Sequence, residues 1–180
     1  MSLNVLFVYG AGPDEGPFGY GAALRSLRDA VVHAFGSQIY VPRIIDYTEY
    51  ATLTRLLQKW DDPTILVGHS CGCGSITRAA VELSMEKIPY LMAIAPSIYC
   101  EVSPLPPNVQ RASQVTSNPA DIFNPGARML LSRSPINNKT ALDEIRSGMM
   151  HIQAPASPLA RDRLIAEVQN VLAPVVAFAG

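Results

Sequence analysis

The sequence predicts an α/β protein whose mostly parallel sheet carries helices on both faces. Short apolar runs alternate along the chain with longer segments whose apolar residues recur at helical spacing. One apolar run leads directly through a glycine-rich turn into a helical segment, as in a β-α unit. Right-handed crossovers then place the carboxyl ends of the strands along one edge, where such sheets bind ligands.

The elements follow from this alternation, and the 180 residues suit a single domain over residues 1–180. We expect strands at residues 3–9, 38–45, 64–67, 89–95, 127–132 and 149–153. We expect helices at residues 20–35, 47–60, 74–85, 139–146 and 159–172. Residues 96–125 hold six prolines and no clear period, and we expect this Pro-rich segment to lie over the active-site edge.

The composition narrows the classes of partner. Apolar residues make up 48% of the chain and charged residues 16%, with a net charge of -1. No basic cluster is present, so neither nucleic acid nor an anionic membrane surface is an expected partner. No stretch approaches the roughly 20 apolar residues of a spanning helix. The start of the chain does not resemble a signal peptide.

The three cysteines, Cys71, Cys73 and Cys100, do not form a two-pair metal motif. We expect them to be reduced thiols in a cytoplasmic protein. No metal and no organic cofactor is expected.

The segment Gly68-His69-Ser70-Cys71-Gly72 matches the pattern G-x-S-x-G. In this pattern a serine occupies a sharp strand-to-helix turn, so that its hydroxyl projects above the sheet. Glycine two residues before and after the serine avoids a clash of Cβ atoms at the turn. The strand at residues 64–67 and the helix that follows supply this context, so we predict that Ser70 is a nucleophile.

Together with the preceding Ile65-Leu66-Val67, this segment resembles the nucleophile elbow of the α/β-hydrolase superfamily. The resemblance covers nearly the whole chain in the order of its elements and implies a single-domain α/β-hydrolase fold. In size and layout, the chain is also similar to the small serine hydrolases related to retinoblastoma-binding protein 9.

The base is expected to be His151, because a serine hydroxyl needs a neighbouring base to attack. His33 lies in a predicted helix, and His69 is adjacent to the serine on a tight turn, where we expect it to pack or hydrogen-bond. His151 follows the serine at the position where the superfamily carries its base. The oxyanion hole is expected to use the backbone N–H groups of Cys71 and Ala11.

The acid is where this sequence departs from the superfamily. Ser134 stands at the expected aspartate position, after the strand predicted at residues 127–132. We favour Glu101 as the carboxylate, with Asn137 as an alternative that orients the histidine through its amide. Asp121 and Asp143 are further alternatives, although each is expected to cap or decorate a short helix.

The predicted function is hydrolysis of a small ester or thioester through an acyl-enzyme on Ser70, with a small acyl compound as substrate. The alternative is a non-catalytic binding module with the same fold and a degraded triad. A dinucleotide-binding turn at Gly10-Ala11-Gly12 is disfavoured, because prolines delay the following helix and no acidic residue lies at the ribose position. Neither the exact substrate nor the oligomeric state follows from the sequence.

Overall fold

The computed structural model describes residues 3–10, 21–83, 88–126 and 128–173. Its strands are β1 (Leu3–Tyr9), β2 (Ile39–Tyr40), β3 (Ile45–Asp46), β4 (Thr64–His69), β5 (Ile88–Ile94), β6 (Val109–Thr116) and β7 (Ala141–Arg146). The strands form one sheet in the order β2-β1-β4-β5-β6-β7, and β3 also pairs with β1. Every pairing between these strands is parallel.

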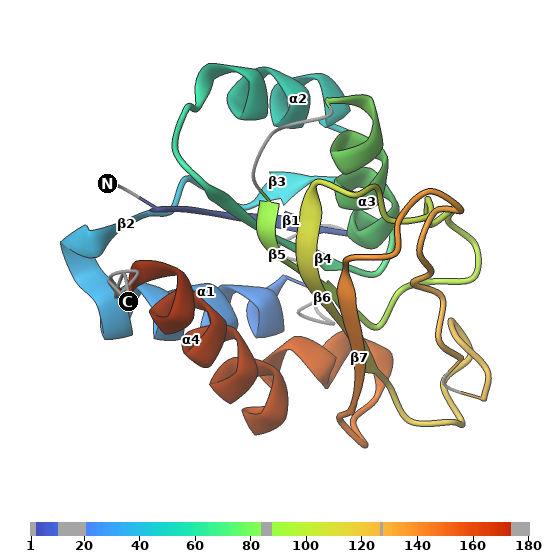
Figure 1. Ribbon diagram of the computed structural model, residues 1–180. Helices are drawn as coiled ribbons and strands as arrows, with labels where there is room; N and C mark the ends of the chain where they lie inside the picture. Colours follow the sequence, from blue (N-terminus) through green and yellow to red (C-terminus); the bar gives the residue numbers. More distant parts are fainter. Residues whose placement is uncertain (1–2, 11–20, 84–87, 127, 174–180) are drawn as a thin grey trace, which may run out of the picture.

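Helices cover both faces of this sheet (Figure 1). They are α1 (Ala22–Phe35), α2 (Tyr50–Lys59), α3 (Gly72–Glu82) and α4 (Pro158–Leu172), with the 3-10 helices η1 (Gly36–Gln38) and η2 (His151–Ala156). α1 and α4 lie on one face, and α2 and α3 lie on the other. This arrangement confirms the predicted fold class.

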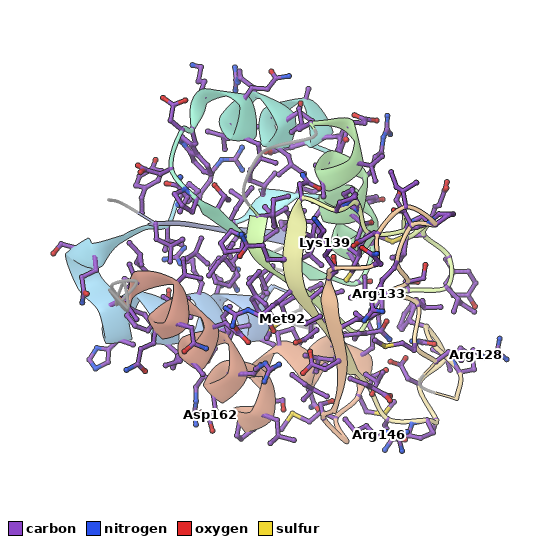
Figure 2. All side chains as sticks on the ribbon, viewed as in Figure 1. Met92, Arg128, Arg133, Lys139, Arg146 and Asp162 are labelled. Carbon is purple, nitrogen blue, oxygen red and sulfur yellow. A yellow bond between two sulfur atoms is a disulfide. The ribbon has the colours of Figure 1, made fainter. Side chains whose placement is uncertain are left out.

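The core consists of two apolar layers, one on each side of the sheet. Along β1, Val5 and Phe7 belong to the layer of α1 and α4, whereas Leu6 and Val8 belong to the layer of α2 and α3. Because a strand covered on both faces buries side chains on each side, β1 has a continuous apolar run from Val5 to Val8. Figure 2 shows Met92 among the interior side chains, while labelled charged side chains such as Arg146 and Asp162 reach outward.

The neighbouring strands β1 and β4 define the crevice of the sheet. The chain leaves β1 toward β2 on one side and later returns to β4 on the other side. At such a switch point the two connections diverge and leave room for a ligand above the strand ends. β1 ends beside Gly10 and β4 ends beside Ser70, so both residues lie at this crevice.

The second half of the chain departs from the predicted elements. Residues 128–132 form no strand, and β6 lies instead inside the Pro-rich segment. Gln114 of β6 explains part of this difference, because its Oε1 accepts hydrogen bonds from the backbone N–H groups of Leu130 and Leu131 at 2.6 and 2.9 Å. A buried side chain thus satisfies backbone groups that a strand would pair with a neighbouring strand.

Two further predicted elements have the wrong type. The helix expected at residues 139–146 is the edge strand β7, whose side chains are mostly exposed or half-buried. Charged side chains are common on edge strands, where they oppose pairing with another chain. In β7 the spacing of charged and apolar side chains also fits a helix, which explains the wrong prediction. The strand expected at residues 149–153 is replaced by η2. The strand expected at residues 38–45 is divided into the short β2 and β3.

No helix in the described part of the chain is both long enough and apolar enough to span a membrane.

Candidate active site

Ser70 lies on a sharp turn between β4 and α3. Its φ of 56° is in the left-handed region, which costs an L-residue about 1–2 kcal/mol. The flanking glycines make the turn feasible. A Cβ on Gly68 would lie 2.8 Å from the carbonyl oxygen of Gly72, and a Cβ on Gly72 would clash with the carbonyl oxygen of Val8. The geometry is that of a nucleophile elbow.

Gly10, at the end of β1, lies against this turn. A Cβ at this position would lie 2.8 Å from Ser70 Oγ and 2.6 Å from the backbone nitrogen of Cys71. Only glycine therefore leaves open the space that both the hydroxyl and the Cys71 N–H border. The second expected oxyanion donor, Ala11, lies outside the described residues.

His151 begins η2, after β7, and only 4% of its surface is exposed. Its ring contacts those of His69 and Phe123, whose centroids are 5.2 and 4.6 Å away. Burial lowers the pKa of His151, and the nearby carboxylate of Asp121 partly opposes this effect. No group in the described part of the chain hydrogen-bonds its Nε2. A neutral imidazole with a free Nε2 suits a general base.

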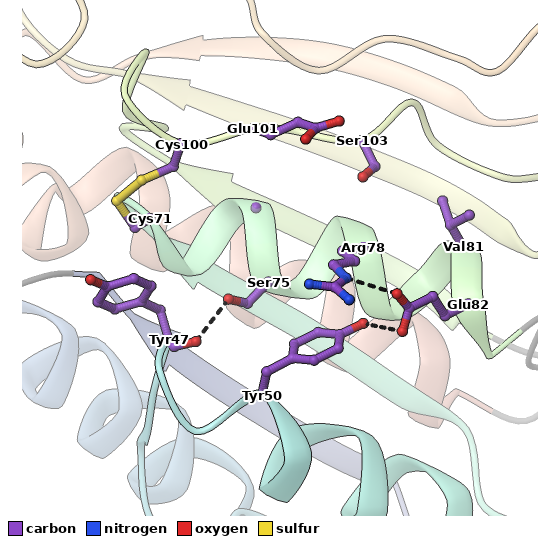
Figure 3. A pocket seen from close by; sticks show the side chains of 11 residues that line it. Tyr47, Tyr50, Cys71, Ser75, Arg78, Val81, Glu82, Cys100, Glu101 and Ser103 are labelled. Atoms are coloured by element: carbon purple, nitrogen blue, oxygen red, sulfur yellow. Dashed lines mark hydrogen bonds and ion pairs between the residues drawn. A yellow bond between two sulfur atoms is a disulfide. The ribbon is translucent and has the colours of Figure 1, made fainter.

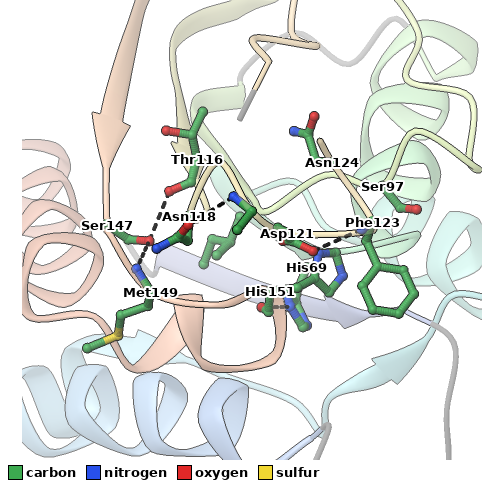
Figure 4. Close-up of polar contacts among 12 residues, drawn as sticks. His69, Ser97, Thr116, Asn118, Asp121, Phe123, Asn124, Ser147, Met149 and His151 are labelled. Atoms are coloured by element: carbon green, nitrogen blue, oxygen red, sulfur yellow. Dashed lines mark hydrogen bonds and ion pairs between the residues drawn. The ribbon is translucent and has the colours of Figure 1, made fainter. Parts of the chain in front are cut away.

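The carboxylate beside His151 is that of Asp121, in the loop after β6 (Figure 4). Asp121 Oδ2 lies 3.3 Å from His151 Nδ1, and the aspartate is 1% exposed. Its other oxygen, Oδ1, accepts a hydrogen bond of 2.9 Å from the backbone N–H of Phe123. Its own N–H donates to the carbonyl of Asn118. The carboxylate is thus held with one oxygen directed toward the imidazole.

His69 is not placed to act as the base. Its Nε2 lies 2.9 Å from the carbonyl oxygen of His151, which requires the N–H tautomer at this nitrogen. Burial, together with the neighbouring His151, lowers the pKa of His69 to about 4. A neutral His69 therefore donates to the backbone of His151 and fixes the start of η2, in agreement with the hydrogen-bonding role expected for it.

The structure does not bring Glu101 or Asn137 to His151. The Glu101 side chain is exposed and lines a different pocket. Asn137 is buried in a turn, where its amide donates to the carbonyl of Leu105 at 2.9 Å and its Oδ1 accepts from the backbone N–H of Thr140. Asp121 lies beside His151 instead, because β6 lies earlier in the chain than the strand expected before the acid.

The expectation of three reduced thiols is wrong for two cysteines. Cys71 and Cys100 form a disulfide with their Cα atoms 5.3 Å apart, whereas Cys73 is a buried free thiol. No group of three or more potential metal-ligating side chains gathers in the described part of the chain.

Ser70 and His151 line the same pocket, which has a volume of about 160 Å³ and is called the serine pocket below. Its other lining residues are Gly10, His69, Cys71, Ser97, Tyr99 and Phe123. Sequence reasoning missed the contributions of Tyr99 and Phe123, which no motif marks. Ser70 and His151 thus meet at the carboxyl edge of the sheet, and Asp121 lies beside His151.

Comparisons with known proteins agree with this geometry. A family model described as serine hydrolase matches residues 31–133, more than half of the chain. A search of curated proteins found no match to this sequence.

Three solved structures share the fold at low sequence identity. A YdeN-like hydrolase from Pectobacterium atrosepticum is 19% identical, with a TM-score of 0.53 over 96% of this chain and 94% of that chain. The RedJ thioesterase from Streptomyces coelicolor is 12% identical, with a TM-score of 0.56 over 94% and 85%. A cutinase-like protein from a Cryptococcus species is 14% identical, with a TM-score of 0.53 over 95% of each chain.

With its elbow at Ser70 and its parallel sheet, the chain belongs to the serine hydrolase family of the α/β-hydrolase superfamily.

Proposed function

We propose that the protein hydrolyses a small ester or thioester through an acyl-enzyme on Ser70. The observation that carries this proposal is the joint placement of Ser70 and His151 in one pocket, with Asp121 Oδ2 at 3.3 Å from His151 Nδ1. A strained serine, a free imidazole nitrogen and a buried carboxylate together form the nucleophile, base and orienting group of acyl transfer.

The reaction proceeds in two steps. Ser70 Oγ attacks the carbonyl carbon while His151 Nε2 takes the hydroxyl proton, and His151 then returns this proton to the leaving alcohol or thiol. Water repeats the attack on the acyl-enzyme and releases the acid. In both steps a positive charge forms on His151, and Asp121 stabilises it. The N–H of Cys71 binds the oxyanion, and the N–H of Ala11 is expected to be the second donor.

The size of the serine pocket favours a small acyl group. Its volume of about 160 Å³ is below the roughly 300–1,000 Å³ of sites that hold drug-sized ligands. Phe123 and Tyr99 give it an aromatic lining. We expect acetyl to butyryl esters to fit and long acyl chains to be excluded.

The partner is therefore a small acyl compound rather than nucleic acid or a membrane. The cytoplasmic location stays a prediction, and the Cys71–Cys100 bridge argues against it, because disulfides rarely persist in a reducing cytosol.

Labelling with a fluorophosphonate probe tests the proposal. The probe phosphonylates an activated serine with loss of fluoride, so intact mass reports one adduct per active site. We expect one adduct on the wild type, none on Ser70→Ala and much slower labelling of His151→Ala. Ser75→Ala is the matched control, since Ser75 lies one turn along α3 and bonds the carbonyl of Tyr47. A folded wild type without an adduct would contradict catalysis and favour the binding module.

A further inference from the structure

The Cys71–Cys100 disulfide joins the nucleophile elbow to the loop after β5. Cys71 directly follows Ser70 and is the N-cap of α3. Cys100 lies 29 residues further along the chain, in the loop that leaves the end of β5. The bridge is therefore the covalent link between the residue that carries the oxyanion donor and a segment that is distant in sequence.

The linked segment, residues 97–101, forms walls of two pockets. Ser97 and Tyr99 line the serine pocket. Cys100 and Glu101 line a second pocket of about 530 Å³ over α3, which Tyr47 and Tyr50 border on the other side and which is called the outer pocket below (Figure 3). Cys71 lines both pockets, so the disulfide lies at the boundary between them.

The outer pocket is lined by aromatic and charged side chains that bond one another. The guanidinium of Arg78 lies 4.4 Å above the ring of Tyr50, and both side chains bond Glu82 at 2.7 Å. The polar groups of these three side chains interact with one another, so the outer pocket is already ordered without a ligand. Its volume becomes accessible to a substrate at Ser70 only if the boundary between the pockets opens.

Few other contacts hold the middle of residues 97–101 in place. Tyr99 is 74% exposed and Ile98 is 44% exposed. Within the described part of the chain, the hydrogen bond that ties this segment to another loop runs from the Ile98 N–H to the Phe123 carbonyl, at 3.0 Å. The hydrogen bond from the Cys100 N–H to the Ser97 carbonyl lies within the segment and does not tie it to another part of the fold. Ser97 is buried, and the carbonyl oxygen of Glu101 packs against α3, where a Cβ on Gly74 would lie 2.4 Å from it. Without the disulfide, the exposed residues between these two ends have little packing.

We propose that the Cys71–Cys100 disulfide is a specificity-determining element, which holds residues 97–101 as the wall between the serine pocket and the outer pocket. This inference rests on the proposed function and deepens it. With the bridge closed, the enzyme takes short acyl esters. With the bridge open, the wall moves, the two pockets merge, and longer acyl chains reach Ser70. The side chains of Cys71 and Cys100 act through the wall and take no part in the chemistry, whereas the backbone N–H of Cys71 remains the oxyanion donor.

Opening the bridge is a two-electron reduction, which a phosphine performs. Each sulfur gains one electron and one proton, and the phosphine takes oxygen from water and becomes a phosphine oxide. Two thiols replace the S–S bond. A cellular dithiol performs the same reduction and becomes a cyclic disulfide.

The experiment compares the hydrolysis of p-nitrophenyl acetate and p-nitrophenyl hexanoate before and after treatment with a phosphine. We expect reduction to raise the hexanoate-to-acetate ratio of kcat/KM about tenfold, mainly through KM. Cys100→Ser should show the raised ratio without reductant and no response to it. Cys73→Ser is the matched control, because Cys73 is outside the bridge, and it should respond as the wild type does. An unchanged ratio after complete reduction would overturn the proposal.

Two further readouts separate this inference from the proposed function. Alkylation of the denatured protein should find one thiol before reduction and three after it, and three thiols in the air-oxidised protein would show that no bridge forms. If fluorophosphonate labelling fails, the proposed function fails, but hydrogen exchange still reports on the wall. The amides of Ile98 and Cys100 should exchange faster after reduction, and unchanged exchange would overturn the inference.

Discussion

Asp121→Asn tests the assignment of the acid, because it removes the negative charge and keeps the size of the side chain. In the proposed reaction His151 becomes positively charged in each transition state, 3.3 Å from Asp121 Oδ2. An amide at this position lacks the charge that stabilises the imidazolium. It also no longer fixes the proton on Nδ1, so part of the enzyme has the wrong tautomer.

The structure sets the size of the effect. Two unit charges 3.3 Å apart attract one another by about 5 kcal/mol at an effective dielectric constant of about 20. Each loss of about 1.4 kcal/mol in transition-state stabilisation slows a reaction tenfold. We therefore expect kcat/KM of Asp121→Asn to fall about 10³- to 10⁴-fold.

The assay is hydrolysis of p-nitrophenyl acetate, with folding checked by circular dichroism. Glu101→Gln tests the carboxylate first favoured from the sequence, and Asp143→Asn is a control at a half-exposed carboxylate paired with Arg163. Both should keep kcat/KM within about twofold of the wild type, as surface changes away from a site usually do. If Asp121→Asn retains a tenth or more of the activity while Glu101→Gln loses it, the assignment to Asp121 is refuted.

Three other predictions follow from the same contacts. Burial lowers the pKa of His69 to about 4, so as the pH falls the unfolded chain binds a proton at this histidine before the folded protein does. The free energy of unfolding should therefore be at its full value above about pH 6.5 and should fall by about 3 kcal/mol toward pH 4. Urea denaturation at both pH values should show this loss, and His69→Gln should reduce it. Gly10→Ala should lower kcat/KM about 10²-fold or more without preventing folding, because the new methyl lies 2.6 Å from the Cys71 nitrogen; activity near that of the wild type would contradict this. Cys100→Ser should lower Tm by roughly 10 °C, since the bridge spans 29 residues and is worth about 3–4 kcal/mol; an unchanged Tm in calorimetry would count against it.

The first half of the fold was predictable because its signals are local. β1, β4 and β5 are buried on both faces, so their apolar runs are continuous. The elbow depends on glycines immediately around Ser70, and steric contact within a few residues is visible in the sequence. His151 was identifiable because only three histidines are present and the others were assigned by position.

The second half was not predictable because tertiary contacts decide it. In β6 the polar side chains of Ser113, Gln114 and Thr116 are buried, and partners from other segments satisfy them. A run with so many polar residues gives no apolar signal for a buried strand. With β6 unrecognised, Asp121 was separated from the strand that positions it and was interpreted as a helix cap.

The register of β6 and β7 explains why Asp121 and His151 meet. The two strands are parallel neighbours, and Thr116 pairs with Arg146 at their carboxyl ends. Asp121 and His151 each lie five residues beyond this pair, so loops of equal length carry them over the same edge of the sheet. The Asn118 N–H donates to the carbonyl of Met149 at 2.7 Å and holds the two loops together. The pairing of Asp121 with His151 is therefore a consequence of strand register. A one-residue insertion between Thr116 and Asp121 should disrupt the pair and lower activity as Asp121→Asn does, while leaving β6 and β7 paired.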